Sequence, residues 1–450
     1  MALATPAGIG ALAIVRLSGP RAWQILSILA ADPDRFDSTE PRNAVLLNLV
    51  DPSTGSALDQ SVVVKYRAPA SFTGEDVVEI TCHGGLSVPL GLTGAAIAAG
   101  ARPATAGEFT HRAFLNGKMD LTQAEAVDDL VHARGDLGRE LALKSLGGAL
   151  GHEVESLRAL LLDLKAILEY DIDFPDEEHI ENLPALVERR VGEAARSIRS
   201  LADSFERNIL FSRGVLTVIA GEPNVGKSTL FNRLVGEERS IVTGRAGTTR
   251  DAVEMEAMIG GLLFRLVDTA GLRHSAGGVE KIGVEYSRRY LKRADLVIFV
   301  HEATRAVDSQ EKAFISGISG KRRLQVANKI DLVPGGSSAL PGGFIPVSAT
   351  EGTGLEELKQ KMAEAALPPC SGENTPQEGL SGAQVTSLRQ KNLLESALRA
   401  LGRIVSLDKT SSEYIVSDLL EATDSLSEIT GKITDEDVLE RIFERFCVGK

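Results

Sequence analysis

The stretch GEPNVGKST (221–229) decides the fold of the central part of this 450-residue chain. It follows the apolar run VLTVIA (215–220) and precedes LFNRLVG (230–236). A GxxxxGK[ST] pattern between a strand and a helix is typical of a phosphate-binding loop. We therefore expect a loop that holds the phosphates of a nucleotide; a chance glycine-rich turn is the alternative.

Four residues of this loop have defined chemical roles. Gly221 and Gly226 let backbone amides turn inward around phosphate oxygens. Lys227 can place its ammonium group on the β- and γ-phosphates, and Ser228 can offer its hydroxyl to Mg²⁺. These roles predict a nucleoside triphosphate bound with magnesium.

Two downstream motifs, GTTRD (247–251) and DTAG (268–271), supply the remaining contacts to the γ-phosphate. Asp268 ends an expected strand and can hold Mg²⁺ through water, while the Gly271 amide can meet the γ-phosphate. Thr249 offers a second hydroxyl to Mg²⁺, in a segment that the γ-phosphate can order.

Two more motifs, NKID (328–331) and SAT (348–350), predict the nature of the base. The Asp331 carboxylate can accept hydrogen bonds from the guanine N1 and N2 donors, a pattern that adenine lacks. The Ala349 backbone amide closes the base site. Five motifs in order therefore predict a domain that binds and hydrolyses GTP, and they argue against the chance turn.

The chain around these motifs divides into four segments by pattern. Strand candidates alternate with helical patterns between residues 211 and 367, which predicts a Ras-like, doubly wound and mainly parallel sheet. The strand candidates are 214–221, 262–271, 294–300, 324–331 and 343–349. Residues 1–117 read as a small α+β domain, with strands at 10–19 and 61–66 and a helix at 88–100. Residues 118–210 have helical spacing. A Pro/Gly/Ser linker (367–382) follows the GTPase domain, and helical spacing resumes after it within the segment 368–450. The GTPase domain therefore reads as an insertion in a helical domain.

The composition disfavours several classes of protein. The formal net charge of −13 argues against broad, non-specific nucleic-acid binding. Cys82, Cys370 and Cys447 form neither a CxxC pair nor a zinc spacing, so we expect a reduced, cytoplasmic location. No apolar run reaches the roughly 20 residues of a membrane helix, and we expect neither a membrane span nor a signal peptide.

The residue after DTAG is Leu272, which cannot orient a water molecule by hydrogen bonding. The enzyme therefore hydrolyses GTP very slowly or uses another residue. Glu280 carries a carboxylate in the same segment, and a solvated surface glutamate is the alternative. Asn224, inside the phosphate loop, could ligate a monovalent cation or could simply form a turn.

Four stretches outside the GTPase motifs make the whole chain resemble the bacterial tRNA modification GTPases of the MnmE (TrmE) type. They are ATPAGIGALAIVRLSG (4–19), SFTGEDVVEITCHGG (71–85), GEFTHRAFLNGKMDLTQAEAVDDL (107–130) and FCVGK (446–450). The resemblance implies that the N-terminal domain is a folate-binding fold that drives dimerisation. It implies a heterotetramer with an FAD-dependent MnmG/GidA-type subunit, acting on tRNA.

The chemistry that the resemblance implies is a C5 modification of the wobble uridine (position 34) of certain tRNAs. A tetrahydrofolate one-carbon unit, from 5,10-methylenetetrahydrofolate or 5-formyltetrahydrofolate, supplies the bridging carbon of a (carboxymethyl)aminomethyl group. Arg16, Glu79, Lys118 and Lys450 match the family's folate contacts.

The resemblance also implies a K⁺-dependent GTPase whose nucleotide domains pair in a homodimer. Asn224, Thr243, Arg245 and Thr248 match the K⁺ ligands, and Glu280 matches the carboxylate that positions water. The residues expected at GTP are Asn224, Val225, Gly226, Lys227, Ser228, Thr229, Thr243, Gly244, Arg245, Ala246, Gly247, Thr248, Thr249, Asp268, Thr269, Ala270, Gly271, Asn328, Lys329, Asp331, Ser348, Ala349 and Thr350.

Three residues are candidates for catalysis: Lys227, Glu280 and Cys447. The Cys447 thiol could attack a one-carbon unit or C6 of a uracil ring, and a buried packing cysteine is the alternative. Two other functions remain open, a ribosome-assembly GTPase and a regulatory switch with purely structural flanking domains. The first leaves residues 1–130 unexplained, because such proteins normally carry a basic RNA-binding domain.

Overall fold

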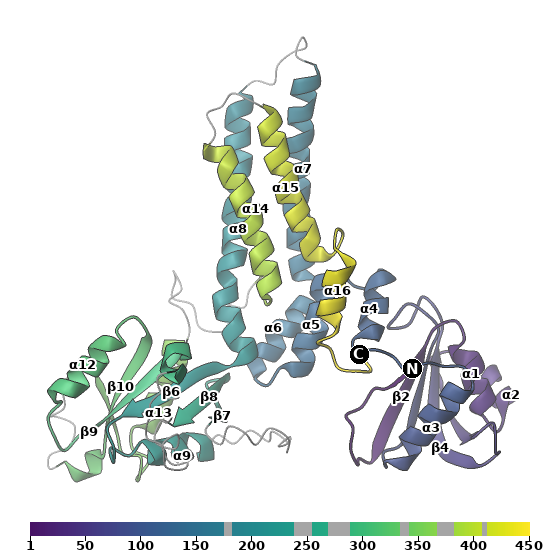
Figure 1. The fold of residues 1–450 in the computed structure, drawn as a ribbon, viewed down its shortest axis with the longest axis horizontal. Coiled ribbons are helices and arrows are strands. Elements are labelled where there is room, and N and C mark those ends of the chain that lie inside the picture. Colours follow the sequence, from purple (N-terminus) through teal and green to yellow (C-terminus); the bar gives the residue numbers. More distant parts are fainter. Residues whose placement is uncertain (175–181, 238–253, 269–288, 334–341, 367–381, 407–411) are drawn as a thin grey trace. The chain divides into compact units, whose positions relative to one another are not determined.

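The computed structural model describes residues 1–450 except 175–181, 238–253, 269–288, 334–341, 367–381 and 407–411 (Figure 1). The described chain divides into two compact units. The first contains residues 1–131, 145–198 and 392–450, and the second contains residues 132–144 and 199–391. No described helix is long and apolar enough to cross a membrane.

The N-terminal part of the first unit is a five-stranded antiparallel sheet of order β1-β2-β5-β4-β3. Alternating residues such as Val15, Val63 and Ile80 are fully buried against helices on this sheet. The α+β prediction is confirmed, with three further strands. The elements are β1 Ala2–Leu3, β2 Leu12–Ser18, α1 Ala22–Leu29, α2 Pro33–Ser38, β3 Ala44–Val50, β4 Ala57–Tyr66, β5 Val77–His83, α3 Ser87–Ala98 and α4 Glu108–Leu115.

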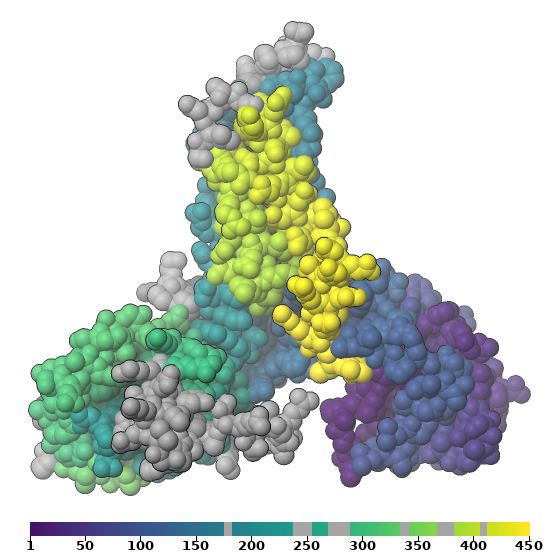
Figure 2. Space-filling model, in the orientation of Figure 1, coloured from purple at the N-terminus to yellow at the C-terminus, as the bar shows by residue number. Residues whose placement is uncertain are grey.

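The rest of the first unit is helical, and it is built from both ends of the chain. Leu157, Leu161, Leu164 and Leu168 form the buried stripe of α7, which packs against α15 from the other end of the sequence. In the space-filling view the yellow α15 lies directly against the blue α7 (Figure 2). The helices are α5 Leu121–His132, α7 Ala149–Asp173, α8 Leu183–Arg213, α14 Leu388–Ser406, α15 Ser412–Thr430 and α16 Glu436–Phe443.

The second unit contains a six-stranded sheet of order β11-β10-β9-β6-β8-β7. All five predicted strands are present and parallel, which confirms the doubly wound fold; β7 at the edge is antiparallel to β8 and was not predicted. The elements are α6 Asp136–Leu146, β6 Val215–Gly221, α9 Lys227–Glu237, β7 Glu254–Ile259, β8 Leu262–Asp268, β9 Leu296–Glu302, α12 Ser309–Gly317, β10 Arg322–Asn328, the 3₁₀ turn η1 Ile330–Leu332, β11 Phe344–Val347 and α13 Leu355–Ala366.

The core of the second unit includes residues from helices that the sequence pattern placed with the helical segment. Leu137 and Leu141 of α6 and Leu210 of α8 are buried together with Ile219 and Phe264 of the sheet. Helix α6 and the end of α8 therefore contribute side chains to the core of the GTPase domain.

Candidate functional site

The phosphate loop connects β6 to α9 and depends on close backbone approach at two glycines. A Cβ atom at Gly221 would lie 2.3 Å from the Val300 carbonyl oxygen of β9. A Cβ atom at Gly226, which has φ +94°, would lie 2.2 Å from Nδ2 of Asn328. No side chain fits at either position, so the glycines of the motif are required by packing as well as by phosphate approach.

The Mg²⁺ candidates lie beside each other after β6 and at the end of β8. Ser228 Oγ donates to Oδ2 of Asp268 at 2.6 Å. Mg²⁺ usually takes one or two protein oxygens together with phosphate oxygens and waters. A hydroxyl and a carboxylate this close fit such an ion: Ser228 would bind it directly, and Asp268 would hold it through water. Lys227 Nζ donates to the Glu222 carbonyl oxygen at 2.6 Å, within the same loop.

Asn328 joins the phosphate loop to both base motifs. Its Nδ2 donates to the Val225 carbonyl oxygen at 2.9 Å, and its Oδ1 accepts from the Ala349 amide at 3.0 Å. Asp331 lies on η1, directly after β10, with its side chain exposed. The carboxyl ends of β6, β10 and β11 thus bring three sequence motifs to one edge of the parallel sheet, where nucleotides bind in this class of fold.

The remaining predicted GTP residues fall into two groups. In the described part, Asn224 is exposed with a left-handed backbone (φ +64°), Lys329 is also left-handed (φ +66°), and buried Ser348 accepts a hydrogen bond from the Glu351 amide at 3.2 Å. Thr229 and Thr350 are exposed at the same edge. Outside the described residues lie Thr243, Gly244, Arg245, Ala246, Gly247, Thr248, Thr249, Thr269, Ala270, Gly271 and Glu280.

Two arginines near the nucleotide site were not predicted. The Arg233 guanidinium donates to the carbonyl oxygens of Ala349 and Thr350 at 3.2 and 2.9 Å, which fixes the loop after β11. Arg305 forms an ion pair with Glu222 of the phosphate loop. Neither arginine belongs to a motif, and no local spacing marks them, because each acts across the fold.

The predicted folate residues come together on the N-terminal sheet. Arg16 of β2 and Glu79 of β5 are direct cross-strand neighbours and form an ion pair at 2.7 Å. The Arg16 guanidinium lies 5.7 Å from the Phe72 ring centroid and 5.6 Å from that of Phe109. The result is a cation held between two aromatic rings beside a carboxylate, an arrangement suited to a planar, polar ring system.

Lys118 lies at the same loop as Phe72. Its Nζ donates to the Pro69 carbonyl oxygen at 3.0 Å. A Cβ atom at Gly74, which has φ +77°, would lie 3.3 Å from the Lys118 side chain. The segment between β4 and β5 is therefore in contact with Lys118 as well as with Arg16.

The C-terminal tail also reaches this sheet. Val448 forms an isolated antiparallel bridge with Ala106, the Phe109 amide donates to the Lys450 carbonyl oxygen at 3.2 Å, and Arg16 Nη1 donates to the Gly449 carbonyl oxygen at 3.4 Å. The structure places the last residues of the chain beside Arg16, as the folate assignment of Lys450 requires.

Cys447 is exposed, so the alternative of a buried packing cysteine is wrong. The buried residue of the tail is its neighbour Phe446, which packs against Phe443 of α16. Cys82 of β5 is the buried thiol, and burial raises its pKa. An exposed thiol keeps the nucleophile hypothesis available for Cys447.

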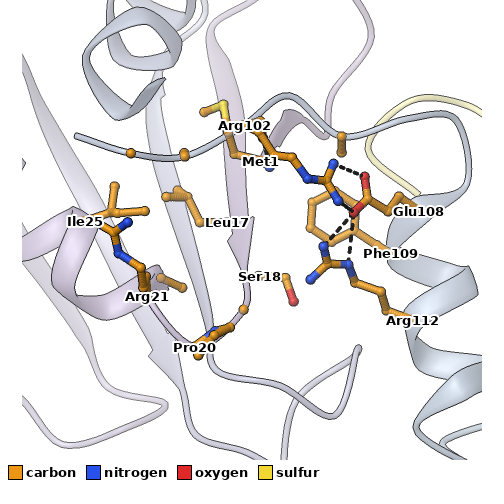
Figure 3. A pocket seen from close by; sticks show the side chains of 15 residues that line it. Met1, Leu17, Ser18, Pro20, Arg21, Ile25, Arg102, Glu108, Phe109 and Arg112 are labelled. Carbon is orange, nitrogen blue, oxygen red and sulfur yellow. Dashed lines mark hydrogen bonds and ion pairs between the residues drawn. The ribbon is translucent and has the colours of Figure 1, made fainter. Parts of the chain in front are cut away.

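A cavity of about 190 Å³ lies between α1, the end of β2 and α4, and Figure 3 shows the ion pairs in its wall. Glu108 binds Arg102 and Arg112, each at 2.6 Å, and Arg112 also binds Glu75 at 2.9 Å. These pairs tie α4, which carries Phe109, to the loop that carries Phe72. They therefore hold both rings around Arg16 in place.

Glu108→Gln is expected to destabilise the N-terminal domain at neutral pH. Burial alone would raise the pKa of Glu108, but hydrogen bonds from Arg102, the Thr105 amide and Arg112 lower it from 4.5 to about 2. A depression of this size corresponds to roughly 3 kcal/mol of stability, present above pH 4.5 and lost as the pH falls towards 2. Urea unfolding followed by the fluorescence of Trp23, the single tryptophan of the chain, reports this domain.

The difference in unfolding free energy between wild type and Glu108→Gln should be largest at pH 6 and should shrink at pH 3. An equal difference at both pH values would show that the network stabilises through shape, independently of the ionised carboxylate.

Comparison with known proteins assigns the family. The family model described as "GTP-binding protein TrmE N-terminus" matches residues 1–118, and "MnmE helical domain" matches residues 121–447. The "tRNA modification GTPase MnmE" of Carboxydothermus hydrogenoformans is 38% identical over 100% of this chain and 98% of that protein. The chain belongs to the MnmE family of tRNA modification GTPases. It is therefore a GTPase.

Other relatives agree over the full length. The MnmE of Thermotoga maritima is 39% identical over 100% of this chain and 99% of that protein. The MnmE of Aquifex aeolicus is 41% identical, with the same two shares. Among solved structures, Era from Aquifex aeolicus is 26% identical, covers 41% of this chain and 66% of that one, and has a TM-score of 0.27.

Proposed function

We propose that this chain is a cytoplasmic, K⁺-dependent GTP hydrolase that acts with an FAD-dependent MnmG/GidA-type subunit. Together they add a (carboxymethyl)aminomethyl group to C5 of the wobble uridine (position 34) of certain tRNAs. A tetrahydrofolate one-carbon unit supplies the bridging carbon. The observation that carries the proposal is the convergence of Arg16, Glu79 and the C-terminal tail on one sheet, in a chain of this family.

The nucleotide half of the proposal is supported by the three motifs that Asn328 joins. GTP binds with its phosphates in the loop 221–226, Mg²⁺ at Ser228 and Thr249, and guanine at Asp331. Lys227 stabilises the charge that develops on the transferred phosphoryl group. Glu280 positions the attacking water, which is consistent with a leucine at position 272.

The folate half is supported by the charge and aromatic arrangement around Arg16. The guanidinium and Glu79 carboxylate offer paired donor and acceptor groups, and two rings flank them. Lys118 and Lys450 supply positive charge for the carboxylates of the folate. Cys447, exposed beside Lys450, is the candidate nucleophile.

Dimerisation and K⁺ complete the proposal. Asn224, with its side chain exposed in the phosphate loop, is a K⁺ ligand together with Thr243, Arg245 and Thr248. Potassium at the phosphates supplies the positive charge that an arginine finger provides elsewhere. Pairing of two nucleotide domains triggers hydrolysis, and the motion that follows couples to the folate and FAD sites.

The test is mass spectrometry of nucleosides from bulk tRNA. A deletion strain should lack the aminomethyl-type wobble uridines, and the wild-type gene should restore them. Glu280→Ala should fail to restore them because hydrolysis is lost, and Cys447→Ser should fail because a hydroxyl is a far weaker nucleophile than a thiolate. Purified wild type should hydrolyse GTP faster in K⁺ than in Na⁺ at equal ionic strength.

Each of the other outcomes would support a different function or mechanism. Intact wobble uridines in the deletion strain would contradict the proposal and favour a ribosome-assembly GTPase, for which ribosome profiles are the next measurement. Full restoration by a gene lacking Lys450 would favour a switch whose flanking domains are structural. Full restoration by Cys447→Ser alone would leave the modification function intact and remove the nucleophile.

A further inference from the structure

We propose that Arg305 is a positioning residue for GTP binding, which acts by holding the second residue of the phosphate loop, Glu222. The proposal rests on the GTP site described above and goes beyond its motifs. Arg305 lies in the turn between β9 and α12, about 80 residues along the chain from the loop that it contacts.

Arg305 makes a forked contact with the carboxylates of Glu222 and Glu311, and its Nη1 also reaches Oδ2 of Asp308 at 3.5 Å. Its Nη2 donates to Oε2 of Glu222 and to Oε1 of Glu311, both at 2.8 Å. Its Nη1 donates to Oε2 of Glu311 at 3.1 Å. The planar guanidinium is thus bound in both arms to Glu311, and one arm is shared with the phosphate loop.

The far side of this contact is rigid. The Glu311 side chain is 1% exposed, and it forms a capping box with Asp308 at the start of α12. His301, at 0% exposure in β9, contacts Glu311 Oε1 through Nδ1 and the Arg305 carbonyl oxygen through Nε2, both at 2.9 Å. A carbonyl oxygen only accepts, so Nε2 donates to it. Both ends of Arg305 are therefore fixed by one buried pair.

Glu222, the phosphate-loop partner of Arg305, is also linked to Lys227. Glu222 is the residue whose carbonyl oxygen accepts the hydrogen bond from Lys227 Nζ. Its neighbour Gly221 is packed under the Val300 carbonyl oxygen of the same strand that carries His301. Fixing the Glu222 side chain therefore fixes the peptide that sets the starting position of Lys227. A loop ordered before binding lowers the conformational cost of binding phosphates.

The same turn also contacts the base side of the site. Glu302, the last residue of β9, binds Lys329 of the NKID motif at 3.1 Å, and the Ala303 amide donates to the Asn328 carbonyl oxygen at 2.8 Å. The turn after β9 thus connects the phosphate loop and the base loop through side chains that belong to neither motif.

The competing explanation is an ion pair that only stabilises the fold. Arg305 and Glu222 are about a third exposed, at 32% and 37%, and such pairs contribute about 0 to 1 kcal/mol. Affinity for nucleotide and stability of the folded chain must therefore be measured separately.

The experiment uses the full chain and fluorescent mant-GDP as the probe. Glu222→Gln keeps the shape of the side chain but removes its charge. Arg305→Lys keeps a cation but loses the planar fork that binds Glu311 through both arms while it reaches Glu222. Each should weaken mant-GDP binding about fivefold, the change that about 1 kcal/mol produces. The double variant should lose no more affinity than the single variant that binds mant-GDP less tightly, because both substitutions break the same contact between Arg305 and Glu222.

The matched control is Lys361→Met, which removes an exposed ion pair with Glu364 on α13 of the same unit. Lys361→Met should leave the affinity for mant-GDP unchanged. Glu222→Gln should leave the melting temperature of the chain unchanged. Unchanged affinity in Glu222→Gln would overturn the proposal. So would independent losses that multiply to about 25-fold in the double variant. Failure of wild type to bind mant-GDP would instead overturn the GTP site itself.

Discussion

Asp331→Asn is expected to change the nucleotide preference of this protein from guanine to xanthine. The carboxylate of Asp331 is exposed directly after β10, where it can accept hydrogen bonds from guanine N1 and N2. An asparagine turns one of these acceptors into a donor, which then faces the guanine amino group. Hydrogen bonds to a charged acceptor contribute about 1.5 to 3 kcal/mol each, so affinity for GDP should fall at least about 100-fold.

Xanthine carries a carbonyl oxygen where guanine carries the amino group. The asparagine amide can donate to that oxygen, and its own oxygen can accept from N1. The variant should therefore bind xanthosine diphosphate more tightly than GDP, the reverse of wild type. Competition of both diphosphates against mant-GDP in wild type, and against mant-XDP in the variant, measures the reversal.

Glu351→Gln is the matched control, because it removes an exposed carboxylate next to the SAT motif that is not among the residues assigned to GTP. It should retain the wild-type preference for GDP. Retained preference for GDP in Asp331→Asn would show that another residue reads the base, and the assignment of the NKID motif would be wrong.

Most of the GTPase fold could be predicted from sequence because its motifs end strands. Each motif needs backbone groups at the carboxyl edge of a parallel sheet, so the motif and the strand before it predict each other. The edge strand β7 was missed for a physical reason. It ends no motif, and its alternating EMEAMI sequence is half exposed, which gives no continuous apolar run.

The residues of the site divide in the same way. Lys227, Ser228 and Asp268 could be placed because their spacing is local to one turn or one strand end. Arg305 and Arg233 could not, because their partners lie far along the chain and become neighbours only through strand order. The pairing of Arg16 with Glu79 depends on the register of β2 and β5, which no local pattern fixes.

Gly449→Ala is expected to weaken the binding of reduced folate to the N-terminal domain by more than about tenfold. Gly449 has φ +97°, a conformation that costs an alanine about 1 kcal/mol, and its Cβ would lie 2.5 Å from the Leu3 carbonyl oxygen and 2.9 Å from Ala4 Cα. The atoms it would meet are backbone atoms of Leu3 and Ala4, which cannot yield as a flexible side chain would, so the tail must leave the sheet. Lys450 and the carbonyl oxygen that accepts from Arg16 leave with it.

Binding of 5-formyltetrahydrofolate to the full chain, measured by calorimetry, should weaken by more than about tenfold, since a charged contact and the order of the tail are lost together. Gly402→Ala is the control, because a Cβ there, on α14, meets nothing within 4 Å. The fluorescence of Trp23 should be the same in both variants, since the sheet itself is not changed. If Gly449→Ala binds the folate as wild type does, the tail makes no contact with the ligand. The contact between the tail and Arg16 would then only stabilise the fold, and Cys447 would no longer be a candidate nucleophile for the one-carbon chemistry.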